Sequence, residues 1–338
     1  MTARAPVWVP LVGPRVEETY DVIVIGGGPA GLSGALVLGR CGRSVLVCDD
    51  DRPRNRFSHA MHGFLSRDGM PPGDFLRLAR EEVQRYPSVR FLPSEVVEVE
   101  RAGDGFEATL AGGAVARGRK LLIATGLVDA LPAVEGLRER WGRSVFPCPF
   151  CDAYEYRGLP MAVYGTAVEA GCGFALEMLT WTEDLTLLTD GSEDEDVAQI
   201  RKLEHLHVRI DRRKIRRLEG EGPRLDSVCF EDGTRLPCRA LFVITDQHQR
   251  NGFAQKLGAR LTGDATVRTG PLQHTRVRGV YAAGNAAVGL QAAIIAAAEG
   301  FKAAYALNDE LIEDRFGEAA ADACLPPTAG AEETDGRA

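Results

Sequence analysis

The sequence predicts an α/β fold built from two nucleotide-binding-type units. A short run of apolar, mostly β-branched residues at 20–25 leads straight into the glycine-rich stretch GGGPAG, and a similar run at 159–165 starts a second strand–helix–strand pattern. Continuous apolar runs of this length are typical of parallel strands that are covered on both faces. Two such starts therefore predict two doubly wound, Rossmann-like, three-layer domains.

The first unit carries a complete dinucleotide-binding pattern. Its strand and glycine-rich loop are followed by a helix over LSGALVLGRCG and by a second strand, 44–51, that ends in acids. The first glycine of such a loop permits the tight turn, the second lets the backbone approach a pyrophosphate, and the third lets helix and strand pack closely. The N–H groups at the helix start bind the anion, and the acid binds ribose hydroxyls. The residues expected to contact the dinucleotide are Gly26, Gly28, Pro29, Ala30, Gly31 and Asp49.

The remaining elements follow in order along the chain. Further strands are predicted at 106–110, 120–126, 159–165, 185–190, 240–245 and 279–285. Helices are predicted at 169–182 and 291–311. Residues 1–19 form a tail before the first strand, and residues 317–338, rich in Ala, Gly, Pro and acids, are expected to be disordered.

Composition excludes several classes of function. The net charge of −8 argues against a nucleic-acid surface, which needs concentrated Lys and Arg. The start of the chain has no apolar run of signal-peptide length, and the most apolar segment, 289–304, is too short to span a bilayer. The sequence therefore predicts a cytoplasmic protein that binds no membrane, in a compartment where thiols stay reduced.

Cys148 and Cys151 form the only CxxC motif among eight cysteines, and Asp152 follows directly. A zinc site is not expected, because no second CxxC or suitably spaced histidine pair supplies the other ligands. A structural disulfide across two residues would stabilise little, since the entropic gain grows with loop length. A redox dithiol remains, in which a following helix start lowers a thiol pKa and Asp152 transfers a proton.

The order of the motifs resembles that of the low-molecular-weight thioredoxin reductases. The glycine loop, the strand end ATG, the CxxC with its aspartate, the second strand–helix–strand unit and GVYAAGN follow one another as in that family, over about residues 20 to 315. The resemblance implies an FAD enzyme, a homodimer, and a partner that is a thioredoxin-like protein or a small dithiol or disulfide. It also implies that the CxxC domain (133–236) is inserted into a discontinuous FAD domain (20–132 and 237–316).

The resemblance also assigns roles to residues. Cys151 exchanges electrons with the flavin, Cys148 attacks the substrate disulfide, and Asp152 is the acid. Asn285 replaces the aspartate that usually holds the ribityl chain, and its amide can still hydrogen-bond. Gln291 opens the helix beside the flavin ring. The further cofactor contacts implied are Ala124, Thr125, Gly126, Gly284 and Ala292.

The second nucleotide-type unit departs from the family. Its loop reads YGTAVEAG, in which Ala167 replaces a glycine, so that a Cβ would crowd a pyrophosphate. The next strand leads into acids where the family has arginines, and like charges repel a 2′-phosphate. NADPH is therefore not expected, whereas Asp190 leaves NADH possible. The acids are Asp190, Glu193, Asp194, Glu195 and Asp196.

Two directions of electron flow stay open. One is a reductase with an atypical electron donor, such as ferredoxin. The other resembles the dithiol oxidases of the gliotoxin and holomycin pathways, which lack an NADPH site, carry CPxC motifs like the CPFC here, and pass electrons through FAD to oxygen. Asp152 favours the first direction, because those oxidases tend to have His at this position. His59 and His62 are candidate bases beside the flavin, although a loop histidine that only hydrogen-bonds is the more common case.

Overall fold

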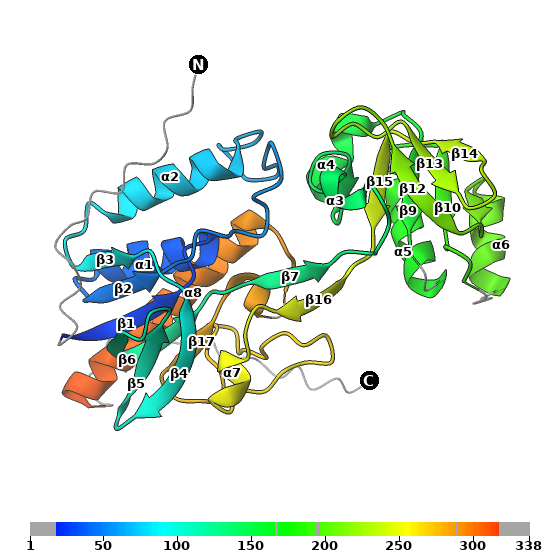
Figure 1. The fold of residues 1–338 in the computed structure, drawn as a ribbon. Helices are drawn as coiled ribbons and strands as arrows, with labels where there is room; N and C mark the ends of the chain where they lie inside the picture. The colour runs from blue at the N-terminus through cyan, green and yellow to red at the C-terminus, as the bar shows by residue number, and fades with distance from the viewer. Residues whose placement is uncertain (1–17, 166–167, 193–196, 288, 318–338) are drawn as a thin grey trace, which may run out of the picture.

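The computed structural model describes residues 18–165, 168–192, 197–287 and 289–317, which form two α/β bodies joined by a two-stranded ribbon (Figure 1). The first body is built on a seven-stranded sheet. Its apolar central strands pair in parallel and are buried on both faces, as their continuous hydrophobic runs predict. The sheet order is β3 (Val89–Leu92), β2 (Val45–Cys48), β1 (Thr19–Ile25), β6 (Val115–Ile123), β5 (Gly105–Leu110) and β4 (Val96–Ala102), with β17 (Val280–Ala282) parallel to β6.

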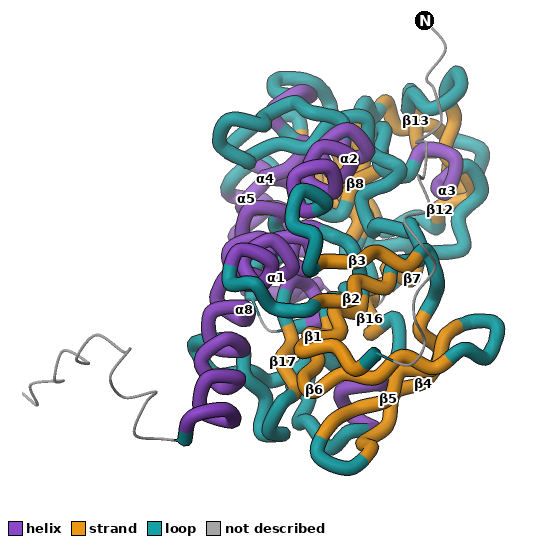
Figure 2. Tube along the Cα trace, turned by 90° about the vertical axis from the view of Figure 1, so that its left-hand side faces the viewer, coloured by secondary structure: helices purple, strands orange, loops and turns teal. Residues whose placement is uncertain are grey.

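Helices α1 (Pro29–Arg40) and α8 (Ala293–Phe316) lie side by side along one face of this sheet (Figure 2). Small residues permit this contact: a Cβ built on Gly300 would lie 2.0 Å from the carbonyl oxygen of Ala30. Helix α2 (Pro72–Val83) packs beside α1, and the short α7 (Phe253–Lys256) contacts β4. Strands β1, β2, β6 and β17 are parallel, so their carboxyl ends lie at the same edge of the sheet. A hydrophobic core fills the space between these strands and the helices.

The second body has a five-stranded parallel sheet and a separate three-stranded antiparallel sheet. The parallel order is β11 (Arg209–Asp211), β10 (Leu185–Leu188), β9 (Met161–Tyr164), β15 (Ala240–Val243) and β8 (Val145–Phe146). The antiparallel strands are β12 (Ile215–Glu219), β13 (Ser227–Phe230) and β14 (Arg235–Pro237). The helical elements are α3 (Leu137–Arg140), α4 (Pro149–Asp152), η1 (Tyr154–Tyr156), α5 (Val168–Met178) and α6 (Val197–His205).

Both crossings between the bodies run through one ribbon, in which β7 (Leu127–Ala130) pairs antiparallel with β16 (Asp246–Gln249). The second body is thus inserted into the first. The sequence prediction of a return at residue 237 is wrong, because β15 completes the second sheet between β9 and β8, and the chain returns only at β16. An apolar run such as β15 fits either sheet equally well by pattern.

The first strand and the last helix begin or end close to their predicted bounds. The first strand begins at Thr19, one residue inside the predicted tail. The late helix extends five residues beyond its predicted end, to Phe316, and Gly317 follows with a φ of 82°. Most of the predicted tails, 1–17 and 318–338, lie outside the described residues. Among the described residues, none of the helices combines the length and hydropathy of a membrane-spanning segment.

Candidate active site

A cavity of about 750 Å³ opens where the parallel strands of the first sheet end, and both bodies line it. The turns after β1, β2, β6 and β17 bring Gly26, Asp49, Ala124 and Ala283 to its wall. This edge of an open α/β sheet is the usual position of a ligand. The predicted residues that line it are Gly26, Gly28, Pro29, Ala30, Asp49, Ala124, Thr125, Gly126, Gly284, Asn285, Gln291, Ala292, Cys148, Cys151 and Asp152.

The glycine loop has the shape of a phosphate cradle. Gly26 has a φ of +108°, and a Cβ there would lie 2.4 Å from the carbonyl oxygen of Ala124. Gly31 is outside the cavity wall; its Cβ would lie 1.9 Å from the carbonyl oxygen of Gly26, so only glycine permits this helix–strand contact. At Gly28 a Cβ would meet no protein atom within 4 Å, because the position faces the cavity.

Two further observations agree with a bound dinucleotide such as FAD. The hydroxyl Oγ1 of Thr125 is buried on the cavity wall with no hydrogen-bond partner among the described residues. A buried hydroxyl without a partner is costly, and a ligand polar group would satisfy it. The carboxylate of Asp49 lies against the glycine loop and accepts a hydrogen bond of 2.7 Å from Arg80. The residues present therefore fit a dinucleotide.

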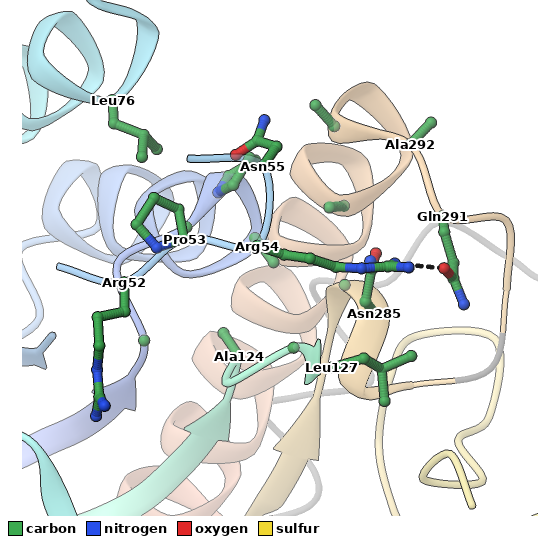
Figure 3. A pocket seen from close by; sticks show the side chains of 18 of the residues that line it. Arg52, Pro53, Arg54, Asn55, Leu76, Ala124, Leu127, Asn285, Gln291 and Ala292 are labelled. Carbon is green, nitrogen blue, oxygen red and sulfur yellow. Dashed lines mark hydrogen bonds between the residues drawn. The ribbon is translucent and has the colours of Figure 1, made fainter. Parts of the chain in front are cut away.

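Sequence reasoning missed a polar cluster at the mouth of the cavity, centred on Arg54. Arg54 donates two hydrogen bonds to Asp129, at 2.7 and 2.5 Å, and a third to Gln291. Gln291 in turn donates to Gln247 at 2.6 Å. Figure 3 shows Arg54 pointing toward Gln291, close to Asn285. Because Asp129 and Gln247 belong to β7 and β16, the cluster connects the ribbon between the bodies to the cavity wall.

The loop that carries Asn285 is held by a second residue that the sequence did not single out. Glu299 is buried on α8 and accepts a hydrogen bond of 2.7 Å from the N–H of Gly284. Burial raises the pKa of this carboxyl, although the bond to Gly284 and the charge of Lys302 oppose the rise. Glu299 lies 15 residues after Gly284, and the two meet only because α8 folds back onto the sheet. Sequence pattern alone therefore did not indicate this contact.

The CxxC motif lines the same cavity as the glycine loop, although the two come from different bodies. Cys148 precedes α4, which contains Cys151 and Asp152, and the two cysteines form a disulfide with their Cα atoms 5.3 Å apart. Phe150, between them, is 75% exposed and packs edge-on against Trp181 at 5.5 Å between ring centroids. The other described cysteines are not part of a disulfide: Cys41, Cys48, Cys172, Cys229 and Cys238.

Asp152 has the electrostatics of a proton carrier. Burial of its carboxyl raises the pKa to about 7, a change that the charge of His62 opposes and that of Glu155 reinforces. A group with a pKa near neutrality is suited to exchange protons with thiols. The two candidate histidines are separated by the structure: His62 lines the cavity, whereas His59 is exposed and is not part of the wall.

In the second body, the acid predicted to bind a ribose, Asp190, is hydrogen-bonded within the protein. Tyr164 ends β9 and donates a hydrogen bond of 2.7 Å to Oδ2 of Asp190, just beyond the neighbouring strand β10. The backbone N–H of Ile215 donates to Oδ1 of the same carboxylate, also at 2.7 Å. Both oxygens of the candidate ribose-binding acid are therefore engaged by the protein. Ala167 and the acids Glu193, Asp194, Glu195 and Asp196 lie outside the described residues.

Comparison with known proteins agrees with this architecture. The family of pyridine nucleotide-disulphide oxidoreductases matches residues 20–300. Thioredoxin reductase tcpT of Claviceps purpurea is 31% identical over 317 residues, which cover 89% of this chain and 97% of tcpT. Thioredoxin reductase sirT of Leptosphaeria maculans is 32% identical over 306 residues, which cover 86% of this chain and 93% of sirT.

Solved structures give the same result. The crystal structure of HlmI is 36% identical, with a TM-score of 0.85, and covers 91% of this chain and 97% of its own. TrxB of Bacillus anthracis, described as a thioredoxin reductase, is 31% identical with a TM-score of 0.84 and covers 88% and 100%. The chain therefore belongs to the pyridine nucleotide-disulphide oxidoreductases and, among them, to the thioredoxin reductase-like flavoproteins; it is a flavin-dependent disulfide oxidoreductase.

Proposed function

We propose that the protein is an FAD-dependent thiol–disulfide oxidoreductase whose Cys148/Cys151 couple exchanges electrons with the flavin and with a small dithiol or disulfide. The observation that carries the proposal is the shared cavity, because the CxxC motif and the glycine loop come from different bodies and line one space. A thioredoxin-like protein is the other partner class. FAD, when bound, supplies a two-electron redox group.

The residues of the chain account for the thiol chemistry. In the oxidising direction a substrate thiolate attacks Sγ of Cys148, the Cys148–Cys151 bond breaks, and Cys151 leaves as a thiolate. A second substrate thiolate attacks the sulfur bound to Cys148, which releases the substrate disulfide and a Cys148 thiolate. The two electrons reduce the Cys148–Cys151 disulfide, and the two substrate protons end on the two cysteine thiolates, one of them by way of Asp152. The reducing direction is the reverse.

The engaged carboxylate of Asp190 favours a reaction without a nicotinamide. A ribose diol needs a carboxylate oxygen as acceptor, and both oxygens of Asp190 accept from Tyr164 and Ile215. This favours the second candidate, an oxygen-dependent oxidase that forms a disulfide in a small dithiol. The aspartate after Cys151 favours the first candidate, a reductase with a donor such as ferredoxin. NADPH and NADH are both disfavoured as donors.

The deciding experiment is the flavin absorbance of the purified protein without oxygen, recorded before and after NADPH, NADH and dithiothreitol. We expect dithiothreitol alone to bleach the flavin and air to restore the colour, which supports the oxidase. Bleaching by a nicotinamide would contradict the reading of Asp190. The variant Cys148→Ser should keep its colour with dithiothreitol, while the control Cys41→Ser, a lone exposed cysteine, should behave as the wild type.

Assembly and location stay predictions. We expect a homodimer, which sedimentation velocity tests directly. We also expect the protein in the cytoplasm, which fractionation of the producing cells tests.

A further inference from the structure

An aromatic side chain lies beside the redox disulfide with most of its surface exposed. Phe150 is between Cys148 and Cys151 in the chain, lines the shared cavity and is 75% exposed. A side chain of this size forgoes the stabilisation that burial would give. Because Phe150 follows Cys148 by two residues in the turn that starts α4, a molecule that reacts with Cys148 must come close to this ring.

Trp181 restricts the orientation of the Phe150 ring. The two rings meet edge to face, with their centroids 5.5 Å apart and an angle of 87° between their planes. Trp181 is itself half-buried, and its backbone carbonyl accepts a hydrogen bond of 2.8 Å from the N–H of Gly158. An aromatic ring that is oriented before binding loses less conformational entropy when a ligand packs against it.

A second exposed apolar side chain reaches the same cavity from the first body. Leu290 precedes α8, lines the cavity and is 80% exposed. Single exposed apolar residues are common on protein surfaces, but two that line one cavity beside a reactive disulfide indicate a binding surface. This surface is concave, because both bodies contribute to it, and it therefore fits a small molecule better than a folded protein.

The arginines on the cavity wall are already paired. In the described part of the chain the wall has four arginines, and each forms an ion pair within the protein. A substrate carboxylate would have to compete with these partners, so the cavity favours recognition by apolar contact over recognition by charge. The pairs are Arg52–Asp50, Arg54–Asp129, Arg80–Asp49 and Arg250–Asp50.

We propose that Phe150 and Leu290 determine specificity for a small dithiol or disulfide that carries an apolar ring. The inference rests on the proposed thiol–disulfide function and names the substrate class of that site. The substrate ring packs against Phe150 while one substrate sulfur reacts with Sγ of Cys148. The bonds that form and break are those of the proposed function, and neither Phe150 nor Leu290 takes part in them.

The test compares two dithiols that form rings of the same size when they are oxidised. Dithiothreitol carries two hydroxyls, whereas ortho-xylenedithiol carries a benzene ring in their place. The second-order rate constant for flavin reduction is measured with each dithiol without oxygen, and the ratio of the ortho-xylenedithiol value to the dithiothreitol value is compared between variants. A change in folding, flavin content or reactivity of the disulfide affects both rate constants and cancels in this ratio.

We expect Phe150→Ser to lower the ratio about tenfold, because the contact with the substrate ring is lost. Phe150→Trp keeps an aromatic surface and should stay within about twofold of the wild-type ratio. Leu290→Ser should lower the ratio about threefold or more. Leu65→Ser is the matched control, because Leu65 is 84% exposed but lies outside the cavity wall, and it should leave the ratio unchanged.

Two results would overturn the inference: an unchanged ratio in Phe150→Ser, or a fall in Leu65→Ser as large as that in Leu290→Ser. The first denies contact between the substrate ring and Phe150, and the second shows that exposed leucines affect the ratio wherever they lie. Failure of the proposed function is distinguishable, because neither dithiol would then reduce the flavin of the wild-type protein.

Discussion

The hydroxyl of Tyr164 and the carboxylate of Asp190 are joined by a hydrogen bond of 2.7 Å across the ends of two neighbouring parallel strands. The bond occupies one acceptor site of the acid that a nucleotide-binding domain of this type offers to a ribose. Burial and the bond to Asp190 raise the pKa of Tyr164, so the phenol stays protonated and remains a donor. The second body therefore keeps the fold of a nucleotide-binding domain, while its ribose-binding candidate, Asp190, is hydrogen-bonded to Tyr164 and Ile215.

Replacement of Tyr164 by Phe is expected to release Oδ2 of Asp190. NADH should then bind about 10- to 100-fold more tightly than in the wild type, since a hydrogen bond to a charged group contributes about 1.5–3 kcal/mol. Isothermal titration with NADH measures this. Tyr20→Phe is the matched control, because Tyr20 is also buried but lies in the first body. Tight NADH binding by the unmodified protein would contradict the prediction.

Asp152→Asn is expected to change both rate and stability. The variant cannot accept a proton, so thiol–disulfide exchange should slow about 100-fold or more. The folded-state pKa of about 7 lies above the usual value, so ionisation of Asp152 destabilises the folded protein as pH rises through the interval between them. The Asn variant should therefore gain stability relative to wild type between about pH 4 and pH 7, and the gain should level off above pH 7 at about 1–3 kcal/mol. Urea unfolding at several pH values checks the sign; a gain that falls with pH would disprove it.

Substitutions at Gly28 and Gly31 are expected to have different effects, the first on flavin binding and the second on stability. Gly28→Val adds a side chain to open space, so the protein should fold with unchanged stability but lose its flavin colour. Gly31→Ala forces a Cβ to within 1.9 Å of a carbonyl oxygen and should lower the free energy of unfolding by about 2 kcal/mol or more. Flavin absorbance together with thermal unfolding separates the two effects. A yellow Gly28→Val protein would remove the loop from the cofactor site.

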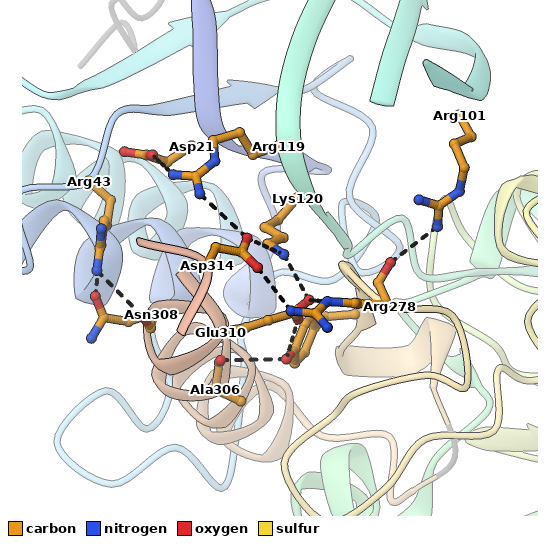
Figure 4. Close-up of polar contacts among 11 residues, drawn as sticks. Asp21, Arg43, Arg101, Arg119, Lys120, Arg278, Ala306, Asn308, Glu310 and Asp314 are labelled. Atoms are coloured by element: carbon orange, nitrogen blue, oxygen red, sulfur yellow. Dashed lines mark hydrogen bonds and ion pairs between the residues drawn. The ribbon is translucent and has the colours of Figure 1, made fainter. Parts of the chain in front are cut away.

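Lys120 should contribute to stability far from the site. It is 6% exposed and pairs with Glu310 at 2.8 Å and with Asp314 at 2.7 Å, which ties β6 to the end of α8 (Figure 4). Lys120→Met leaves Asp314 with arginine partners and Glu310 with Arg278 and the hydroxyl of Tyr281, and should cost about 2–3 kcal/mol. Arg278→Met, in which a 71% exposed side chain loses its pair with the same acids, should cost less than about 1 kcal/mol. Denaturant unfolding of both variants tests the contrast, which equal losses would refute.

Local patterns made the chemistry predictable from the sequence. The glycine loop and the CxxC are each contained in a few consecutive residues, and both line the cavity. Contacts between distant segments were not predictable. Arg54 and Asp129 are 75 positions apart, and Tyr164 and Asp190 are 26 apart, so their pairing depends on how separate strands and loops meet in space. The assignment of β15 failed for the same reason, because hydrophobic pattern does not identify the partner strand.

The ribbon of β7 and β16 has a consequence for the history and engineering of this chain. Ala130 and Asp246 are direct partners in the ribbon, so the segment between them leaves and re-enters at a single point. A two-residue turn such as Asn-Gly would close these strands into a hairpin and excise the whole inserted unit. Because its two ends are adjacent, the inserted domain can be removed or replaced by another domain without changing the path of the chain through the flavin-binding body.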